Sequence, residues 1–216
     1  MYQPAHFTVT ELGHIHEFVT SVASADLVTV DDSGQPLSTL MPCMWKLDES
    51  GHGTLFMHMA RANKQWESIA NGARALAIVH GPQAYVSPSN YVTKAEHGKV
   101  VPTWNYTSVH LSGIVEVSHD PEYLRGIVRE LTDHHEHGRS TPWSIDDAPE
   151  TYMSAQLRGI VAITVHVDRV EAKAKLSQNR SQEDQNGVIE DLSNSSHHDD
   201  NAIATLMSSE GNKLIR

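Results

Sequence analysis

The sequence predicts a mainly β protein with flanking helices, in the α+β class. In several segments, β-branched and apolar residues alternate with polar ones between Gly, Pro or Asp residues, which is typical of strands. The expected strands cover residues 25–30, 36–47, 54–59, 73–80, 104–117 and 159–170. Other segments place apolar residues at helical spacing. The expected helices cover residues 12–22, 61–71, 121–138, 146–157, 181–192 and 201–207.

The N-terminal part begins with a helix that precedes a hairpin. Thr8 and Glu11 form a capping box, and Leu12, Ile15 and Val19 follow at the spacing of one helix face. Residues 31–34, Asp-Asp-Ser-Gly, then predict a tight turn between the first two strands. We therefore expect an amphipathic helix laid on a β core.

The C-terminal half contains a helix with clear boundaries and a cluster of histidines. Asp120 is a good N-cap and Pro121 a good first helical residue. Residues 133–138 invite a metal hypothesis, but their spacing is not His-Glu-x-x-His and no distant ligand set is identifiable. Histidines at a helix C-terminus also complement its dipole, so we expect no metal. The strand over 159–170 is apolar on nearly both faces, which predicts a central position.

Composition limits the function and the compartment. The 216 residues, 39% hydrophobic and 20% charged, suit one sizeable domain, alone or with a small appendage. The single cysteine, Cys43, excludes an internal disulfide, and no signal peptide or membrane-spanning run is evident, so we expect a cytoplasmic protein. Acidic residues outnumber basic ones 27 to 16, for a net charge of −11, which argues against direct DNA binding. P-loop, Gly-x-Gly-x-x-Gly, Gly-x-Ser-x-Gly and Cys-x-x-Cys motifs are absent.

Residues 81–106 carry the most distinctive pattern. Gly-Pro-Gln-Ala-Tyr-Val-Ser-Pro over 81–88 is followed, after a variable spacer, by Val-Pro-Thr-Trp-Asn-Tyr over 101–106. Because proline fixes φ and removes a donor, each proline is expected to end or edge a strand. From these residues alone, the simplest interpretation is an edge hairpin with packed aromatic rings.

The order of several such strings resembles the signature of the PaiB-type FMN-binding negative regulators. This family is a branch of the FMN-binding split-barrel superfamily, which also contains pyridoxamine-phosphate oxidase. The resemblance covers nearly the whole chain and includes residues 1–7, 58–66, 143–152 and 175–180. It implies an antiparallel split β-barrel of the FMN-binding type over 1–172, and a helical extension packed on the barrel over 173–216. It also implies a homodimer with FMN in the groove between subunits.

The chain departs from the family pattern at four positions. The family usually has Pro at the position of Lys64 and Trp at that of Asn90. It has Gly and Trp where this chain has Ala172 and Ala174. These departures raise the question of whether flavin binding is weakened.

The junction near residue 61 is the expected phosphate site. A strand that runs into a helix offers free backbone N–H groups and a positive dipole end to an anion. Arg61 and Lys64 add two cations there, and His58 and Asn63 can donate hydrogen bonds. From the residues alone, the simpler interpretation is that Arg61 and Lys64 are solvated surface charges. The resemblance makes Arg61 the preferred ligand of the FMN phosphate.

The resemblance also implies residues that contact the flavin ring. One subunit would line the isoalloxazine with two short segments: Ser38, Thr39 and Leu40, and Tyr85, Val86 and Ser87. The partner would contribute Trp104, Asn105 and Tyr106. A donor-rich segment near the groove would add Lys175, Ser177 and Gln178.

Two functional classes follow from the resemblance, and the sequence names no catalytic residue. In the first, FMN is a sensor or structural ligand of a regulator. In the second, the protein is an FMN-dependent oxidoreductase acting on a small molecule. Flavin reduction by NAD(P)H with reoxidation by an acceptor would favour the enzyme, whereas salt-sensitive binding to a promoter fragment would favour the regulator.

Overall fold

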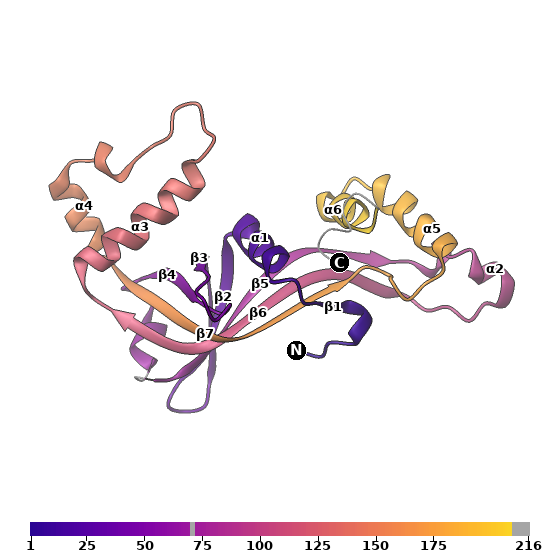
Figure 1. Ribbon diagram of the computed structural model, residues 1–216, viewed down its shortest axis with the longest axis horizontal. Coiled ribbons are helices and arrows are strands. Elements are labelled where there is room, and N and C mark those ends of the chain that lie inside the picture. Colours follow the sequence, from indigo (N-terminus) through magenta and orange to yellow (C-terminus); the bar gives the residue numbers. More distant parts are fainter. Residues whose placement is uncertain (70–71, 209–216) are drawn as a thin grey trace. The chain divides into compact units, whose positions relative to one another are not determined.

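The computed structural model describes residues 1–69 and 72–208 (Figure 1). Its strands are β1 (Thr8–Val9), β2 (Ser24–Val30), β3 (Pro36–Lys46), β4 (Thr54–Ala60), β5 (Arg74–Val86), β6 (Thr103–Ser118) and β7 (Ile160–Lys175). Its α-helices are α1 (Leu12–Val22), α2 (Thr93–His97), α3 (Pro121–Glu136), α4 (Glu150–Leu157), α5 (Gln182–Ser193) and α6 (His198–Met207). Short 3-10 helices are η1 (Ala5–Phe7), η2 (Lys64–Ser68), η3 (Pro88–Asn90) and η4 (Ile145–Asp147).

The strands form one sheet that closes on itself. Their hydrogen-bonded order is β1-β7-β4-β3-β2-β5-β6, and β6 also pairs with β7. The registers of β2 with β3 and β5, of β3 with β4 and of β4 with β7 are antiparallel. A sheet whose last strand pairs with an earlier one is a barrel, so the predicted antiparallel barrel with flanking helices is confirmed.

The chain divides into two compact units that are each discontinuous in sequence. The second unit comprises residues 19–79 and 110–170. Within it, alternate side chains of β4 and β7 fill the barrel, and Leu55, Met57 and Val165 are completely buried. Burial also raises the pKa of the Cys43 thiol to about 12, so this cysteine stays protonated and unreactive.

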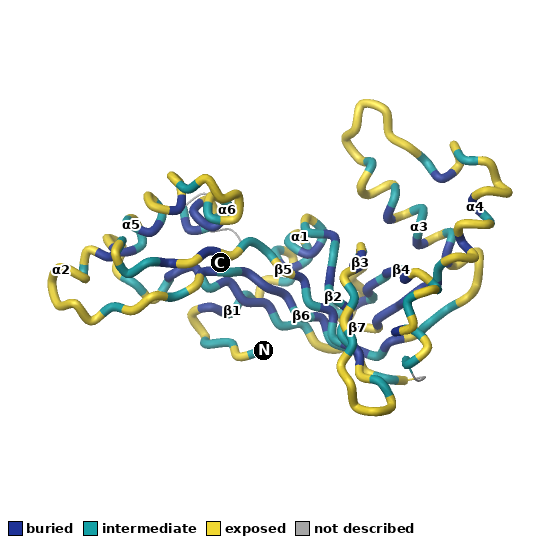
Figure 2. Tube along the Cα trace, turned by 180° about the vertical axis from the view of Figure 1, so that it is seen from behind, coloured by how far each residue is buried: buried dark blue, intermediate teal, exposed yellow. Residues whose placement is uncertain are grey.

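Helices α3 and α4 belong to the same unit and share a hydrophobic cluster with its strands. The cluster contains Leu124, Ile127, Leu131, Leu157 and Ala162. As predicted, α3 begins at Pro121, and its N-cap Asp120 accepts a hydrogen bond from the Tyr123 backbone N–H at 2.8 Å. Figure 2 shows that buried positions recur along the strands, whereas the connection between α3 and α4 is largely exposed.

The first unit comprises residues 1–18, 80–109 and 171–216, described to residue 208. The predicted C-terminal helices are present as α5 and α6, and they pack on strand residues of this unit. Their shared core contains Ala84, Val86, Tyr91, Ala174, Leu176, Val188, Leu192, Ile203, Ala204 and Met207. The division of the chain at residue 172 remains a prediction.

The helix expected over 61–71 is wrong. Only residues 64–68 are helical, as the 3-10 helix η2, and Ile69 already has extended dihedral angles. The reason lies in tertiary contacts: the Gln65 side chain is buried and donates to the Leu27 carbonyl at 3.0 Å. The Trp66 indole donates to the Arg61 carbonyl at 3.0 Å. Ala70 and Asn71, also part of this prediction, lie outside the described residues.

Two predicted strand ends are also wrong. β5 continues through Pro82 to Val86, because Ala84 and Val86 beyond the proline are buried and packing keeps the chain extended. Gly81 permits this path, since a Cβ there would lie 2.0 Å from Thr107 Oγ1 and 2.7 Å from the Phe18 ring. β7 continues to Lys175 rather than ending at residue 170, because it pairs with β1 and buries Lys173.

Candidate functional site

In the second unit, a polar network fixes the corner between β4 and η2. The Asn63 amide donates to Thr39 Oγ1 at 2.8 Å, and the Thr39 hydroxyl donates to Gln65 Oε1 at 2.6 Å. Asn63 also caps η2 by accepting from the Gln65 backbone N–H at 3.0 Å. The structure thus brings two predicted site residues together, Thr39 and Asn63. It adds Gln65, whose only sequence signal was its place beside Trp66 in the family motif.

Arg61 has several partners at the same corner. Its Nε donates to the Arg158 carbonyl at 2.9 Å, its Nη2 to the Ile160 carbonyl at 3.1 Å, and its Nη1 approaches His119 Nδ1 at 3.3 Å. The guanidinium also lies 6.0 Å from the centre of the Trp66 ring. Because arginine has five N–H donors, two remain for a ligand. Arg61 therefore ties the end of β4 to the start of β7 and keeps a limited capacity to bind an anion.

A cavity of about 290 Å³ adjoins this arginine. Its lining includes Arg61, His119, Arg125 and Arg158 together with Glu150. Arg125 pairs with Glu150, whereas the Arg158 side chain has no ion-pair or hydrogen-bond partner among the described residues. The cavity is thus lined by three arginines and two carboxylates, because Glu122 also lines it, and one arginine is paired with Glu150.

The other two predicted phosphate ligands differ in character. Lys64 is exposed, and its Nζ lies 2.7 Å from Glu67 Oε1, a surface pair of low stability that a ligand can displace. His58 lies on β4 with its Nδ1 buried and without a partner. Burial lowers the His58 pKa, so this side chain is neutral at pH 7 and can bind an anion only through an N–H.

On β3, the three predicted ring contacts do not share one face. Successive strand residues point to opposite sides, and Thr39 points into the Gln65 network while Ser38 and Leu40 do not. Ser38 Oγ lies 3.4 Å from Asp26 Oδ1, and Leu40 is 66% exposed. Ser38 and Leu40 are therefore available to a ligand on the outer face of β3. Thr39 lies on the other face, where its hydrogen bonds to Asn63 and Gln65 hold the corner between β4 and η2.

In the first unit, two aromatic side chains form an exposed pair. The rings of Tyr85 on β5 and Trp104 on β6 meet edge to face, with centroids 6.0 Å apart and an interplanar angle of 72°. Tyr85 is 48% exposed and Trp104 is 52% exposed, whereas the adjacent Val86 is buried. Large rings left half exposed on adjacent strands provide an apolar surface for a ligand or a second protein.

Two lysines on β7, Lys173 and Lys175, belong to the same unit as this ring pair. Lys175 Nζ donates to Thr103 Oγ1 at 2.6 Å and to the Trp104 carbonyl. Burial, followed by repulsion from Lys173 and Arg180, lowers the Lys175 pKa. The predicted flavin contacts did not include Lys173, although its spacing of two from Lys175 places both on one face of a strand.

Asn105, Ser177 and Gln178 have internal roles. Asn105 is completely buried, and its amide donates to Ser177 Oγ at 3.0 Å and lies near Met207. Gln178 accepts from the Leu176 backbone N–H at 2.7 Å and donates to the Ala174 carbonyl at 2.6 Å. These contacts hold the turn after β7, where Ser177 has a left-handed φ of 63°. Tyr106 is half buried, with its ring centre 5.2 Å from Lys173 Nζ.

Asn90 and Ser87 also form hydrogen bonds within the first unit. The Asn90 amide donates to Asp191 Oδ2 at 2.7 Å, and a Cβ on Gly187 would lie 2.1 Å from the Asn90 carbonyl oxygen. Ser87 caps η3 by accepting from the Ser89 backbone N–H at 3.2 Å. The departure from the family's Trp at Asn90 therefore coincides with close packing of η3 against α5.

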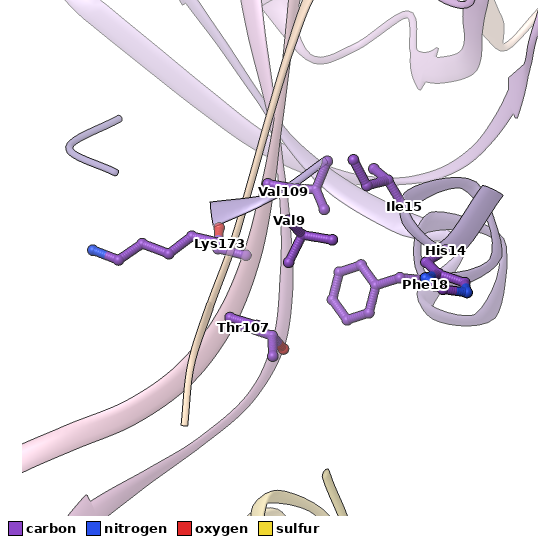
Figure 3. A pocket seen from close by; sticks show the side chains of 10 residues that line it. Val9, His14, Ile15, Phe18, Thr107, Val109 and Lys173 are labelled. Atoms are coloured by element: carbon purple, nitrogen blue, oxygen red, sulfur yellow. The ribbon is translucent and has the colours of Figure 1, made fainter. Parts of the chain in front are cut away.

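A small cavity lies between α1 and the strands of the first unit (Figure 3). Its lining includes Val9, Phe18 and the two family departures, Ala172 and Ala174. The buried Thr107 Oγ1, which also faces it, has no hydrogen-bond partner among the residues that the structure describes. Its volume of about 20 Å³ holds at most one water molecule, so a flavin cannot occupy it.

The described residues contain no group of three or more His, Cys, Asp or Glu side chains that could hold a metal. Within the same residues, no helix is both long and apolar enough to cross a membrane.

Comparisons with known proteins identify the family of this chain and agree with its fold. Residues 1–169 match the model of a family described as "Putative FMN-binding domain". Over 215 residues, covering 100% of both chains, the sequence is 31% identical to the protease synthase and sporulation protein PAI 2 of Bacillus subtilis. The fold is similar to the FAD and heme binding protein from Mycobacterium smegmatis, with a TM-score of 0.57, 19% identity and coverage of 78% of this chain and 73% of that one. It is also similar to the flavocytochrome Anf3 from Azotobacter vinelandii, with a TM-score of 0.54, 14% identity and coverage of 78% and 69%.

Proposed function

Because this chain belongs to the PaiB-type family of FMN-binding proteins, we propose that it binds FMN in a groove between two copies and acts as a flavin-responsive regulator. FMN is the cofactor of the family, as the resemblance implied. The full-length relative is named as a protease synthase and sporulation protein, which supports a regulatory role. The binding geometry, the homodimer and the regulation are proposals.

The observation that carries the proposal is the exposed Tyr85–Trp104 pair with Lys175 beneath it. An isoalloxazine ring is planar, apolar on its faces and polar along one edge, so aromatic rings and a neighbouring cation suit its two kinds of surface. Half-exposed rings are also costly on a free monomer, because exposed apolar area remains in contact with water. Because the two rings are in contact, we expect one flavin, bound mainly by a second copy, to cover both of them, so that Tyr85 joins Trp104 and Tyr106 in serving the partner's site.

For the phosphate, we retain Arg61, Lys64, His58 and Asn63 as the proposed ligands. Lys64 can exchange Glu67 for a phosphate at little cost, because its present ion pair is exposed. Arg61 contributes its two remaining N–H groups, whereas the neutral His58 contributes no charge. On β3, Ser38 and Leu40 are the proposed ring contacts.

Regulation by direct DNA contact is disfavoured by the net charge of −11. We therefore propose an indirect effect, in which flavin occupancy or redox state changes what the dimer binds. The alternative function is an FMN-dependent oxidoreductase acting on a small molecule. It draws support from Lys175, a cation with a lowered pKa beside an exposed aromatic surface.

The test is a titration of the full-length protein with FMN, followed by flavin fluorescence, together with light scattering to measure the mass of the particle. The proposal expects stoichiometric FMN binding and a mass of two chains. A protein that ignores FMN contradicts it. NADPH or NADH oxidation with an added acceptor, compared with binding to a promoter fragment at two salt concentrations, then separates the oxidoreductase from a DNA-binding regulator.

A further inference from the structure

Two lysines on one face of β7 lack carboxylate partners. Lys173 and Lys175 alternate with the buried Ala172 and Ala174, so their side chains lie on the opposite face. Glu171, also at this spacing, binds the N-terminal amine at 2.8 Å. Among the residues that the structure describes, neither lysine forms an ion pair.

The two lysines are stabilised in different ways. Lys173 is only 8% exposed, and its Nζ donates to the Tyr2 carbonyl at 3.1 Å. The rings of Tyr2, Phe7 and Tyr106 have centres 5.7, 6.0 and 5.2 Å from that nitrogen, so cation–π attraction offsets part of the cost of burial. Lys173 is therefore enclosed by the protein itself.

Lys175 has a different environment. It is half buried, and its ammonium is fixed between Thr103 Oγ1 and the Trp104 carbonyl. Lys173 and Arg180 repel it, which adds to the desolvation that lowers its pKa. Its Nζ also lies 5.8 Å from the centre of the Phe7 ring. These contacts hold the ammonium in one place, although burial and its cationic neighbours oppose the charge.

The position of Lys175 suggests a use for this charge. Trp104, whose carbonyl binds the ammonium, forms the exposed ring pair with Tyr85. A ligand lying against this pair would therefore meet the fixed positive charge of Lys175 at the start of β6, next to Trp104. The charge would favour a ligand, or a state of a ligand, that carries negative charge close to its aromatic ring.

We propose that Lys175 makes the protein prefer reduced over oxidised FMN. This inference rests on the proposed function. Were FMN bound here, its reduction by transfer of two electrons and one proton from a donor such as NAD(P)H would add one negative charge to the ring system. Lys175 would stabilise that charge electrostatically, and no bond to the lysine would form or break.

The test compares variants of the full-length protein reconstituted with FMN. Lys175→Met removes the charge at similar length, Lys175→Arg keeps it, and Lys99→Met removes an exposed charge from the same unit as a control. The midpoint potential of the bound flavin is measured by equilibration with a reference dye during reduction by xanthine oxidase and xanthine. We expect Lys175→Met to reduce the preference for reduced flavin about tenfold, or about 30 mV for a two-electron couple. We expect Lys175→Arg and Lys99→Met to stay near the wild-type potential.

A Lys175→Met protein that keeps its flavin at the wild-type potential overturns the inference while leaving FMN binding intact. If the wild type itself takes up no FMN, the proposed function fails instead. Should Lys175→Met lose its flavin, acetylation of the wild-type protein with acetic anhydride decides the matter by mass spectrometry, with oxidised and with reduced FMN at the same subsaturating concentration. Stronger protection of Lys175 by reduced FMN, with Lys99 unprotected, supports the inference, and equal labelling with the two forms overturns it.

Discussion

Replacing Arg61 by alanine separates a structural role from a ligand-binding role. In the free protein, the guanidinium donates to the carbonyls of Arg158 and Ile160 at 2.9 and 3.1 Å. A hydrogen bond from a charged group contributes about 1.5–3 kcal/mol when well shielded, and less when solvent competes. One of these bonds is exposed and one is partly buried. We therefore expect Arg61→Ala to lower the free energy of unfolding by about 1–2 kcal/mol.

The assay is urea unfolding of the flavin-free protein at pH 7, followed by tryptophan fluorescence. Arg158→Ala is the matched control, because Arg158 lines the same cavity but its side chain has no partner among the described residues. The control should stay within about 0.5 kcal/mol of the wild type. An Arg61→Ala protein as stable as the control would refute the claim that this arginine ties β4 to β7.

The same two variants test the phosphate assignment. If Arg61 also binds the FMN phosphate, Arg61→Ala weakens FMN binding by about 1.5–3 kcal/mol, the range for a hydrogen bond to a charged group. Titration is carried out well below the urea transition, so that only folded protein is compared. Unchanged affinity would remove Arg61 from the phosphate site and leave Lys64 and Asn63 as its main ligands.

Three further changes test other parts of the structure. Gly81→Ala should destabilise the protein by about 1–3 kcal/mol, because the new Cβ overlaps Thr107 Oγ1 and the Phe18 ring; wild-type stability in urea would contradict that packing. Trp104→Ala should weaken both FMN binding and dimerisation, measured by flavin fluorescence and light scattering; a variant that keeps both would refute the shared site. His58 has a lowered pKa in the folded state, so the stability it contributes is present above its ordinary pKa of about 6.5 and is lost as the pH falls toward the folded value. His58→Gln should therefore flatten the pH dependence of urea unfolding below pH 6.5, and an unchanged slope would contradict the burial of this imidazole.

The parts of the fold that sequence reasoning predicted are those that local patterns determine. The capping residues of α3 and the alternation along β2 and β4 appear in the structure where the residues predict them. The helix over 61–71 failed because Gln65 and Trp66 make their hydrogen bonds to distant or non-helical partners. No local pattern reports such bonds, and they outweigh helix propensity.

The candidate site was harder to predict than the fold, because the role of a polar residue depends on its partners. Asn105 was expected to face the flavin of a partner, yet its amide is completely buried against Ser177. Lys173 was left out of the predicted site because the simplest interpretation of its segment is a solvated connector, and the sequence does not show the aromatic rings that surround this lysine. Identity and spacing named the candidate segments, whereas the direction of each side chain required the fold.

The distribution of ion pairs explains how an acidic protein can serve an anionic cofactor. Several surface cations are neutralised by carboxylates: Lys46 by Glu130, Arg74 by Asp168, Arg125 by Glu150 and Arg129 by Asp146. In the described part of the chain, Arg61, Lys173 and Lys175 have no carboxylate partner. Nucleic acid needs many unpaired cations over an extended surface, which a net charge of −11 disfavours. A single FMN needs only a few cations at fixed places, so the same charge pattern that opposes DNA contact is compatible with binding a phosphorylated flavin.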